Sequence, residues 1–147
     1  MIKLKFDEKE YLRLMELVYL GNWVINSAKD EPEKEYEVVE SKIFSHAQTA
    51  GCSDLADYAE EFKEYFPTAK FDELMSDRIE EYDNNTFWER LIEYMAKNEL
   101  LEKYKDRKED FDSMPREKKW TEIDSLEDKY RAEFEKHGID RLFLNTH

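Results

Sequence analysis

The stretch DEKEYLRLMELVYLGNWVINS, residues 7–27, decides the fold. Asp7 and Glu10 have the spacing of a capping box, in which each side chain accepts from the other residue's backbone N–H. They predict a helix that begins after Asp7 and ends near Ser27. The apolar residues that follow cover about 260° of the helix circumference when each residue turns by roughly 100°. A helix that is apolar nearly all round is expected in the middle of a bundle.

The rest of the chain predicts further helices. Asp30, Pro32 and Glu33 open a second helix that stops at Gly51. A third is expected from Ser53 to Phe66 and a fourth from about Ala69 to Tyr82, with a break at residues 83–85. Thr86 and Glu89 form the capping box of a fifth, residues 103–114 read as a loop, and Pro115 opens a last helix of about 22 residues that stops at Gly138. Residues 1–147 are therefore expected to form one mainly α domain, a compact bundle of five to seven helices around the N-terminal helix.

Both ends of the chain have strand character. Ile2, Leu4 and Phe6 alternate with Lys3 and Lys5, which is the period of a half-buried strand. A single strand needs a partner, and residues 142–144 (LFL) at the other end are the candidate. We therefore predict one short two-stranded pairing of the termini.

Charge and composition limit the function classes. The chain of 147 residues has a net charge of −14, and residues 30–96 hold 19 acidic against 6 basic residues. Such a field repels phosphate backbones and anionic lipid, which argues against direct binding to nucleic acid or to a membrane. The single cysteine, Cys52, fits a reducing compartment, and no window approaches the roughly 20 apolar residues of a membrane span. We expect a cytoplasmic protein.

The sequence offers few groups for chemistry. Asn22 lies in the apolar arc of the first helix and His46 at the edge of the second helix's apolar stripe, so they are the candidate buried polar pair. With Cys52 they match hydrolase residue types, but no sequence context activates the thiol. The histidines lack the Glu-x-x-His partner of carboxylate-bundle metal sites, and the scattered glycines form no phosphate-binding loop. We assign no catalytic residue, no metal ligand and no cofactor.

The fifth helix carries Phe87 next to Trp88, and its apolar arc of about 200° is wider than one packing contact requires. These rings serve either the chain's own core or a partner, with the core favoured. The candidate partner face combines aromatic and acidic residues: Phe87, Trp88, Tyr94, Glu60, Glu61, Glu80 and Glu81.

Three segments, YLRLMELVYLGNWVINS (11–27), NNTFWERLIEYMA (84–96) and EFEKHGIDRL (133–142), together resemble a pattern found in small, uncharacterised bacterial all-helical proteins. The resemblance implies a bacterial origin and a single helical domain, and it implies no activity.

These observations predict a non-enzymatic interaction protein, an adaptor or regulatory subunit whose acidic face meets a basic protein partner. The sequence also allows a homodimer. Two alternatives stay open: an acidic mimic of nucleic acid that occupies a DNA-binding protein, and a small-molecule enzyme or hydrolase that uses His46.

Overall fold

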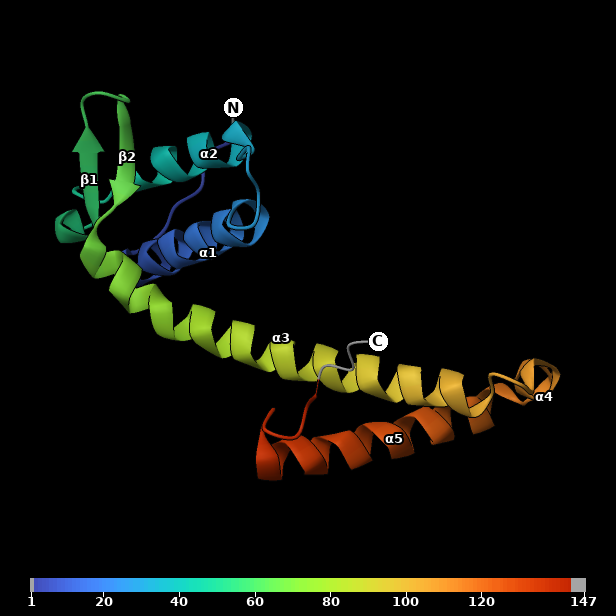
Figure 1. The fold of residues 1–147 in the computed structure, drawn as a ribbon. Helices are drawn as coiled ribbons and strands as arrows, with labels where there is room; N and C mark the ends of the chain where they lie inside the picture. The colour runs from blue at the N-terminus through green and yellow to red at the C-terminus, as the bar shows by residue number, and fades with distance from the viewer. Residues whose placement is uncertain (1, 144–147) are drawn as a thin grey trace. The chain divides into compact units, whose positions relative to one another are not determined.

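The computed structural model describes residues 2–143, which contain five α-helices and one two-stranded sheet (Figure 1). The chain divides into two compact units, unit 1 (residues 1–81) and unit 2 (residues 82–147). The mainly helical prediction is confirmed, while the expectation of one domain stays a prediction. The elements are α1 (Glu8–Asn26), α2 (Lys34–Phe44), β1 (Ala56–Ala59), β2 (Glu64–Pro67), α3 (Ala69–Lys103), α4 (Lys108–Ser113) and α5 (Arg116–His137).

Helix α1 begins at the predicted capping box. The Asp7 carboxylate accepts from the Glu10 N–H at 2.9 Å, and the Glu10 carboxylate accepts from the Asp7 N–H at 2.9 Å. Within unit 1, Tyr11 and Met15 are buried, whereas Leu17 and Val24 are exposed. The helix is thus covered on one side, and its burial nearly all round, which the apolar arc predicted, is wrong.

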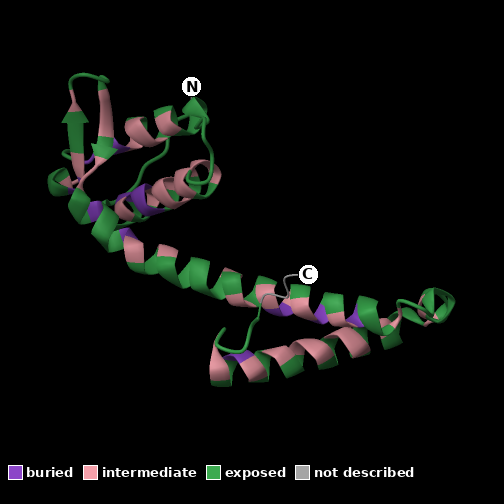
Figure 2. Ribbon diagram, viewed as in Figure 1, coloured by how far each residue is buried: buried purple, intermediate pink, exposed green. Residues whose placement is uncertain are grey.

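The core of unit 1 joins α1, α2, the segment before β1, and the start of α3. The ring of Phe71 meets the rings of Tyr19 and Phe44 edge-on, with centroids 5.3 Å and 5.2 Å away. Edge-to-face contacts of this kind add to the gain from burying the rings. Figure 2 shows the buried positions at this junction; the cluster comprises Tyr11, Met15, Phe44, Ala47, Leu55, Phe71 and Met75.

The third predicted helix, Ser53 to Phe66, is wrong. A short 3-10 turn (Ser53–Leu55) leads instead into an antiparallel hairpin, in which Asp57 is opposite Phe66 and Tyr58 is opposite Tyr65. The turn of the hairpin contains Lys63 at φ 56°. This left-handed conformation suits a turn between strands and does not occur inside a right-handed helix. Contacts with α2 stabilise the strands, because the Tyr65 N–H donates to Ser41 Oγ at 2.8 Å.

The break predicted at residues 83–85 is also wrong, since α3 runs without interruption from Ala69 to Lys103. Asp83, Asn84 and Asn85 are weak helix formers, but each costs only a fraction of a kcal/mol, roughly 0.5, relative to alanine. No glycine or proline stands there to stop the helix. The predicted loop over residues 103–114 contains the short helix α4.

Unit 2 pairs its part of α3 with α5, and its buried residues are Ile92, Ala96, Leu100 and Phe134. Helix α5 has the predicted 22 residues between Pro115 and Gly138, and Gly138 has a positive φ of 55°. This prediction is confirmed because proline and glycine mark helix ends through their own backbone geometry.

The predicted pairing of the termini is not found among the described residues. Neither residues 2–6 nor Leu142 and Phe143 belong to a strand, and Leu144 lies outside the described residues. The only sheet that the structure describes is the hairpin of unit 1.

Candidate interaction surface

The hairpin of unit 1 exposes aromatic rings and carboxylates together. Phe62, in the turn between the strands, is 63% exposed, and its ring meets the ring of Phe66 at 5.9 Å. Residues 56–67 hold four acidic residues and one basic residue, Lys63. We define the hairpin surface by its exposed acidic and aromatic members: Asp57, Tyr58, Glu60, Glu61, Phe62 and Phe66; Lys63 is exposed in the same turn.

The acidic side chains of the hairpin surface are solvated rather than neutralised. Among the residues that the structure describes, Asp57, Glu60 and Glu61 take part in no ion pair. By contrast, Glu16 on α1 is nearly buried and is paired with Arg13 at 2.5 Å. The charge of the hairpin surface is therefore available to an incoming cationic group.

The sequence-predicted partner face divides between the two units. Glu60 and Glu61 lie in the hairpin turn and Glu80 and Glu81 are exposed on α3, all in unit 1. The three aromatic members, Phe87, Trp88 and Tyr94, belong to unit 2. The residues of the predicted partner face therefore belong to two different units, whereas the hairpin surface lies within unit 1 alone.

The neighbouring rings of Phe87 and Trp88 have different environments. Trp88 is half-buried, and its ring centroid lies 5.7 Å from that of Phe134 on α5. Its indole N–H donates to Asn84 Oδ1 at 3.1 Å. Phe87 is 51% exposed and touches the edge of Trp88 at 5.0 Å. Trp88 thus belongs to the packing of unit 2, whereas about half of Phe87 faces solvent.

The predicted pair of Asn22 and His46 is not formed. Asn22 is half-buried and its amide donates to Glu40 Oε2 at 2.9 Å, while its own oxygen accepts from Asn26 Nδ2 at 2.7 Å. His46 is exposed beyond the end of α2. The core amide is satisfied as expected, but by a carboxylate on α2.

Glu40 is a group that sequence reasoning missed. Burial, with the nearby charges of Glu37 and Asp72, raises the pKa of Glu40 to about 7, although the Asn22 hydrogen bond acts in the opposite direction. Close by, the Tyr19 hydroxyl donates to Asp72 at 3.0 Å. The usable signal was spacing, since Glu40 stands one helical turn before Phe44 and therefore on the buried side of α2.

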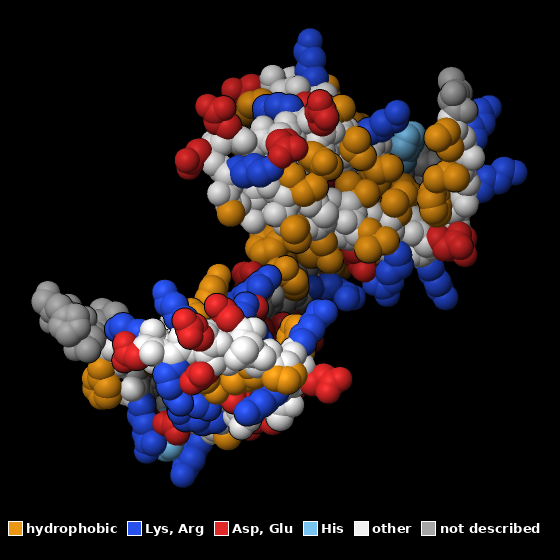
Figure 3. Space-filling view, turned by 90° about the vertical axis from the view of Figure 1, so that its right-hand side faces the viewer, with side chains coloured by type: hydrophobic (Ala, Val, Ile, Leu, Met, Phe, Trp, Pro, Cys, Tyr) orange, Lys and Arg blue, Asp and Glu red, His pale blue; other side chains and the backbone are white. Residues whose placement is uncertain are grey.

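An open groove of about 470 Å³ lies beside the start of α1. Its walls include Leu4 and Phe6 from the N-terminal segment, Leu14 from α1, and Ile43 and His46 from α2 and the residues after it. Figure 3 shows hydrophobic side chains gathered over one face of unit 1. The groove is mostly apolar, and Asp7 and Glu8 line it together with His46.

The described residues assemble no nucleophilic or metal site. Burial raises the pKa of the Cys52 thiol, with Asp54 and Glu8 acting in the same direction, so the thiol stays protonated and weakly nucleophilic near neutral pH. No group of three His, Cys, Asp or Glu residues in the described part of the chain could hold a metal ion.

Among the described residues, no helix combines the length and apolar character that crossing a membrane requires. Comparison with protein-family models, with curated proteins and with solved structures finds no match to this chain.

Proposed function

We propose that this protein is a non-enzymatic, cytoplasmic interaction protein, an adaptor or regulatory subunit, whose hairpin surface binds a basic protein partner. The observation that carries the proposal is the joint exposure of rings and unpaired carboxylates on one hairpin. Phe62 is 63% exposed beside Glu60 and Glu61. Exposed aromatic anchors within a charged rim are the combination that protein interfaces favour.

The two kinds of side chain would have different tasks. Carboxylates attract and orient a lysine-rich or arginine-rich surface over a long range, which raises the association rate. The rings of Phe62, Phe66 and Tyr58 supply apolar area, and aromatic faces also attract cations. The partner should therefore present basic residues next to an apolar or cationic group that the rings can cover.

The test is capture from native lysate at about 50 mM and about 500 mM salt, because exposed charge contacts weaken over this range. The protein carrying Glu60→Lys and Glu61→Lys should lose the partner at low salt. Phe62→Ala should lose it at both salt concentrations, since this substitution removes apolar contact rather than charge. The captured protein should be basic when it is identified by mass spectrometry.

The matched control carries Asp124→Lys and Asp128→Lys, which make the same change of charge on exposed positions of α5. It should retain the partner, because α5 lies outside the hairpin surface. Equal capture by wild type and by the Glu60→Lys, Glu61→Lys protein would refute the proposal. A DNA-binding protein among the captured partners would favour the reading of this chain as a nucleic-acid mimic.

A further inference from the structure

The N-terminal segment Ile2–Phe6, which we call the arm, is a strand sequence without a strand partner. Ile2 is 87% and Leu4 is 72% exposed, and the three apolar residues alternate with Lys3 and Lys5. Neither lysine takes part in an ion pair within the described residues. The arm therefore has exposed apolar side chains, unpaired lysines and backbone groups that are not part of a sheet.

The same unit contains a sheet edge that lacks a neighbour. Tyr65 directs its N–H away from β1, toward Ser41 Oγ. Tyr58 and Tyr65 are therefore a non-hydrogen-bonded pair of the antiparallel ladder, in which the backbone N–H and C=O of each residue point away from the other strand. The N–H and C=O of Tyr58 consequently face the outer edge of β1. Figure 1 shows β1 at the outside of the hairpin, with β2 between it and α2.

The arm and the edge of β1 match in side-chain pattern. On β1, Tyr58 and Asp57 point to opposite faces of the sheet, because successive residues alternate. If the arm formed a strand, its apolar residues would point to one face and its lysines to the other, because successive residues alternate. An added strand that places Leu4 beside Tyr58 places one of the two lysines directly beside Asp57 and the other beside Ala59, diagonal to Asp57 and within reach of a long side chain.

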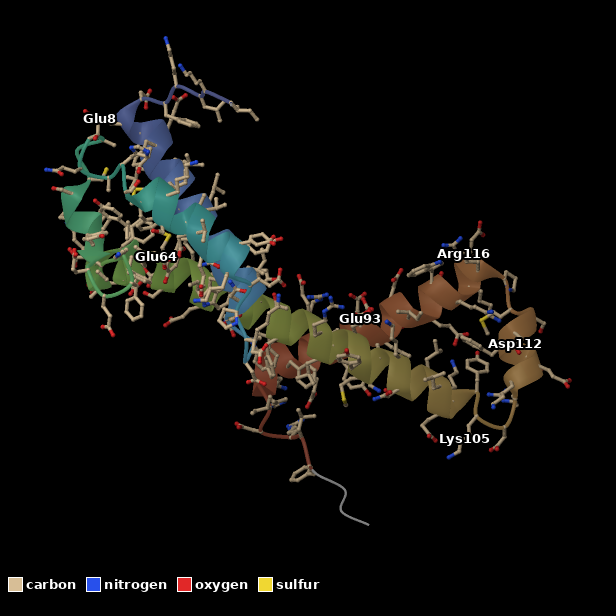
Figure 4. The ribbon with its side chains drawn as sticks, turned by 90° about the horizontal axis from the view of Figure 1, so that it is seen from above. Glu8, Glu64, Glu93, Lys105, Asp112 and Arg116 are labelled. Carbon is tan, nitrogen blue, oxygen red and sulfur yellow. The ribbon has the colours of Figure 1, made fainter. Side chains whose placement is uncertain are left out.

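The arm of the same copy lies elsewhere. Leu4 and Phe6 line the groove with Leu14 and Ile43, and the capping box at Asp7 fixes the point where the arm leaves α1. Figure 4 shows the arm extending past Glu8, while Glu64 marks the hairpin at a different part of the unit. The edge of β1 is thus left for another molecule.

We propose that the arm of a second copy pairs with the edge of β1, and that two copies exchange arms in a two-fold symmetric dimer. A two-stranded sheet is marginal alone, and a third strand would complete it and close an edge that otherwise invites nonspecific pairing. The contact is isologous, since each copy gives one arm and receives one. The inference does not rest on the proposed function, since it is tested on the purified protein alone. The two proposals share Asp57 and Tyr58, so a bound arm and a basic partner would compete for these residues.

The test uses two oppositely charged variants. The first carries Lys3→Glu and Lys5→Glu, and its acidic arm should be repelled by Asp57. The second carries Asp57→Lys, and its basic edge should repel its own basic arm. Each variant alone should dimerise at least about tenfold more weakly than wild type in sedimentation equilibrium at low salt. An equimolar mixture should dimerise again, because both arm contacts in the mixed dimer join opposite charges.

Lys9→Glu is the matched control, since Lys9 is exposed on α1 next to the arm but outside it. It should dimerise like wild type. The proposal is overturned if wild type is monomeric up to about 500 µM, a weak-affinity limit, if either variant dimerises like wild type, or if the mixture stays monomeric.

A second measurement needs only wild type and the arm variant. Hydrogen exchange at the Tyr58 amide should slow as protein concentration rises, because the arm of the second copy accepts this hydrogen bond. The Lys3→Glu, Lys5→Glu protein should not show this concentration dependence. Equal exchange of the Tyr58 amide in dilute and concentrated wild type would contradict the pairing, even if Asp57→Lys fails to fold.

Discussion

Phe87 and Trp88 are adjacent in sequence but differ in what their removal should cost. Trp88→Ala removes the contact with Phe134 and should lower the free energy of unfolding by about 2 kcal/mol. Phe87→Ala removes a ring that is half exposed, and should cost less than about 1 kcal/mol. Urea denaturation followed by circular dichroism measures both. Equal losses in the two variants would show that Phe87 is also part of the packing.

Glu40 makes the stability of unit 1 depend on pH. Its pKa is raised to about 7, so the folded state holds a proton that the unfolded state has already released above about pH 4.3. The stabilising contribution of this proton to the free energy of unfolding is complete below the pKa of the unfolded state, and it is lost as pH rises through about 7. With allowance for solvent screening of a half-buried group, the loss should be about 1–2 kcal/mol.

Glu40→Gln tests this dependence, because glutamine keeps an oxygen that can accept from Asn22 but carries no charge. The variant should gain stability relative to wild type between pH 4 and pH 8 in urea denaturation. Glu35→Gln, at an exposed position of the same helix, provides the control. A constant difference between Glu40→Gln and wild type over this range would contradict the assignment.

Between elements, α3 and α5 of unit 2 are joined by two reciprocal contacts. Glu99 on α3 accepts from Tyr130 at 2.5 Å and from Lys129 at 2.6 Å on α5. Glu122 on α5 accepts at 2.9 Å from Lys103, the last residue of α3, and at 2.9 Å from Tyr104, the residue after it. The hydrogen bonds from the lysines have the larger effect and those from the tyrosines the smaller, and together they hold the pKa of both glutamates below the usual value. The two contacts fix the register of the helix pair.

Tyr130→Phe should lower the free energy of unfolding of unit 2 by about 0.5–1 kcal/mol, because it removes one hydrogen bond to a carboxylate and keeps the ring. Tyr82→Phe is the matched control, since Tyr82 is exposed, and its change should stay within about 0.5 kcal/mol. Urea denaturation of both variants makes the comparison. A Tyr130→Phe protein as stable as Tyr82→Phe would mean that water replaces the lost contact.

The elements that the sequence predicted correctly have local end signals. The Asp7 capping box and the Pro115 and Gly138 boundaries each depend on residues within one helical turn. The hairpin depends on Ser41 and α2, which are distant in sequence, and residues 53–66 otherwise have the composition of a helix. The missed pairing of Asn22 with Glu40 has the same cause, since it joins two helices across the core of unit 1.

At the scale of the whole molecule, the acidic excess is concentrated in one unit. Residues 1–81 hold 20 acidic and 10 basic residues, and residues 82–147 hold 17 and 13. This imbalance, like that of residues 30–96, is counted from the sequence alone, because charge counting needs no fold. The sequence could not assign part of this charge to the hairpin surface, since that required knowing that residues 56–67 form a hairpin. The proposed partner and the arm of a second copy both meet unit 1.

Three buried or half-buried tyrosines give the unfolding of both units an optical signal. Burial, aided at Tyr19 and Tyr130 by carboxylate partners, raises the pKa of Tyr11, Tyr19 and Tyr130 to about 12. A free phenol ionises near pH 10, with a new ultraviolet absorption band. At an alkaline pH between these values, unfolding converts these three residues to phenolate. Two of them lie in unit 1 and one in unit 2, so absorbance spectroscopy can follow the unfolding of the protein without an attached dye.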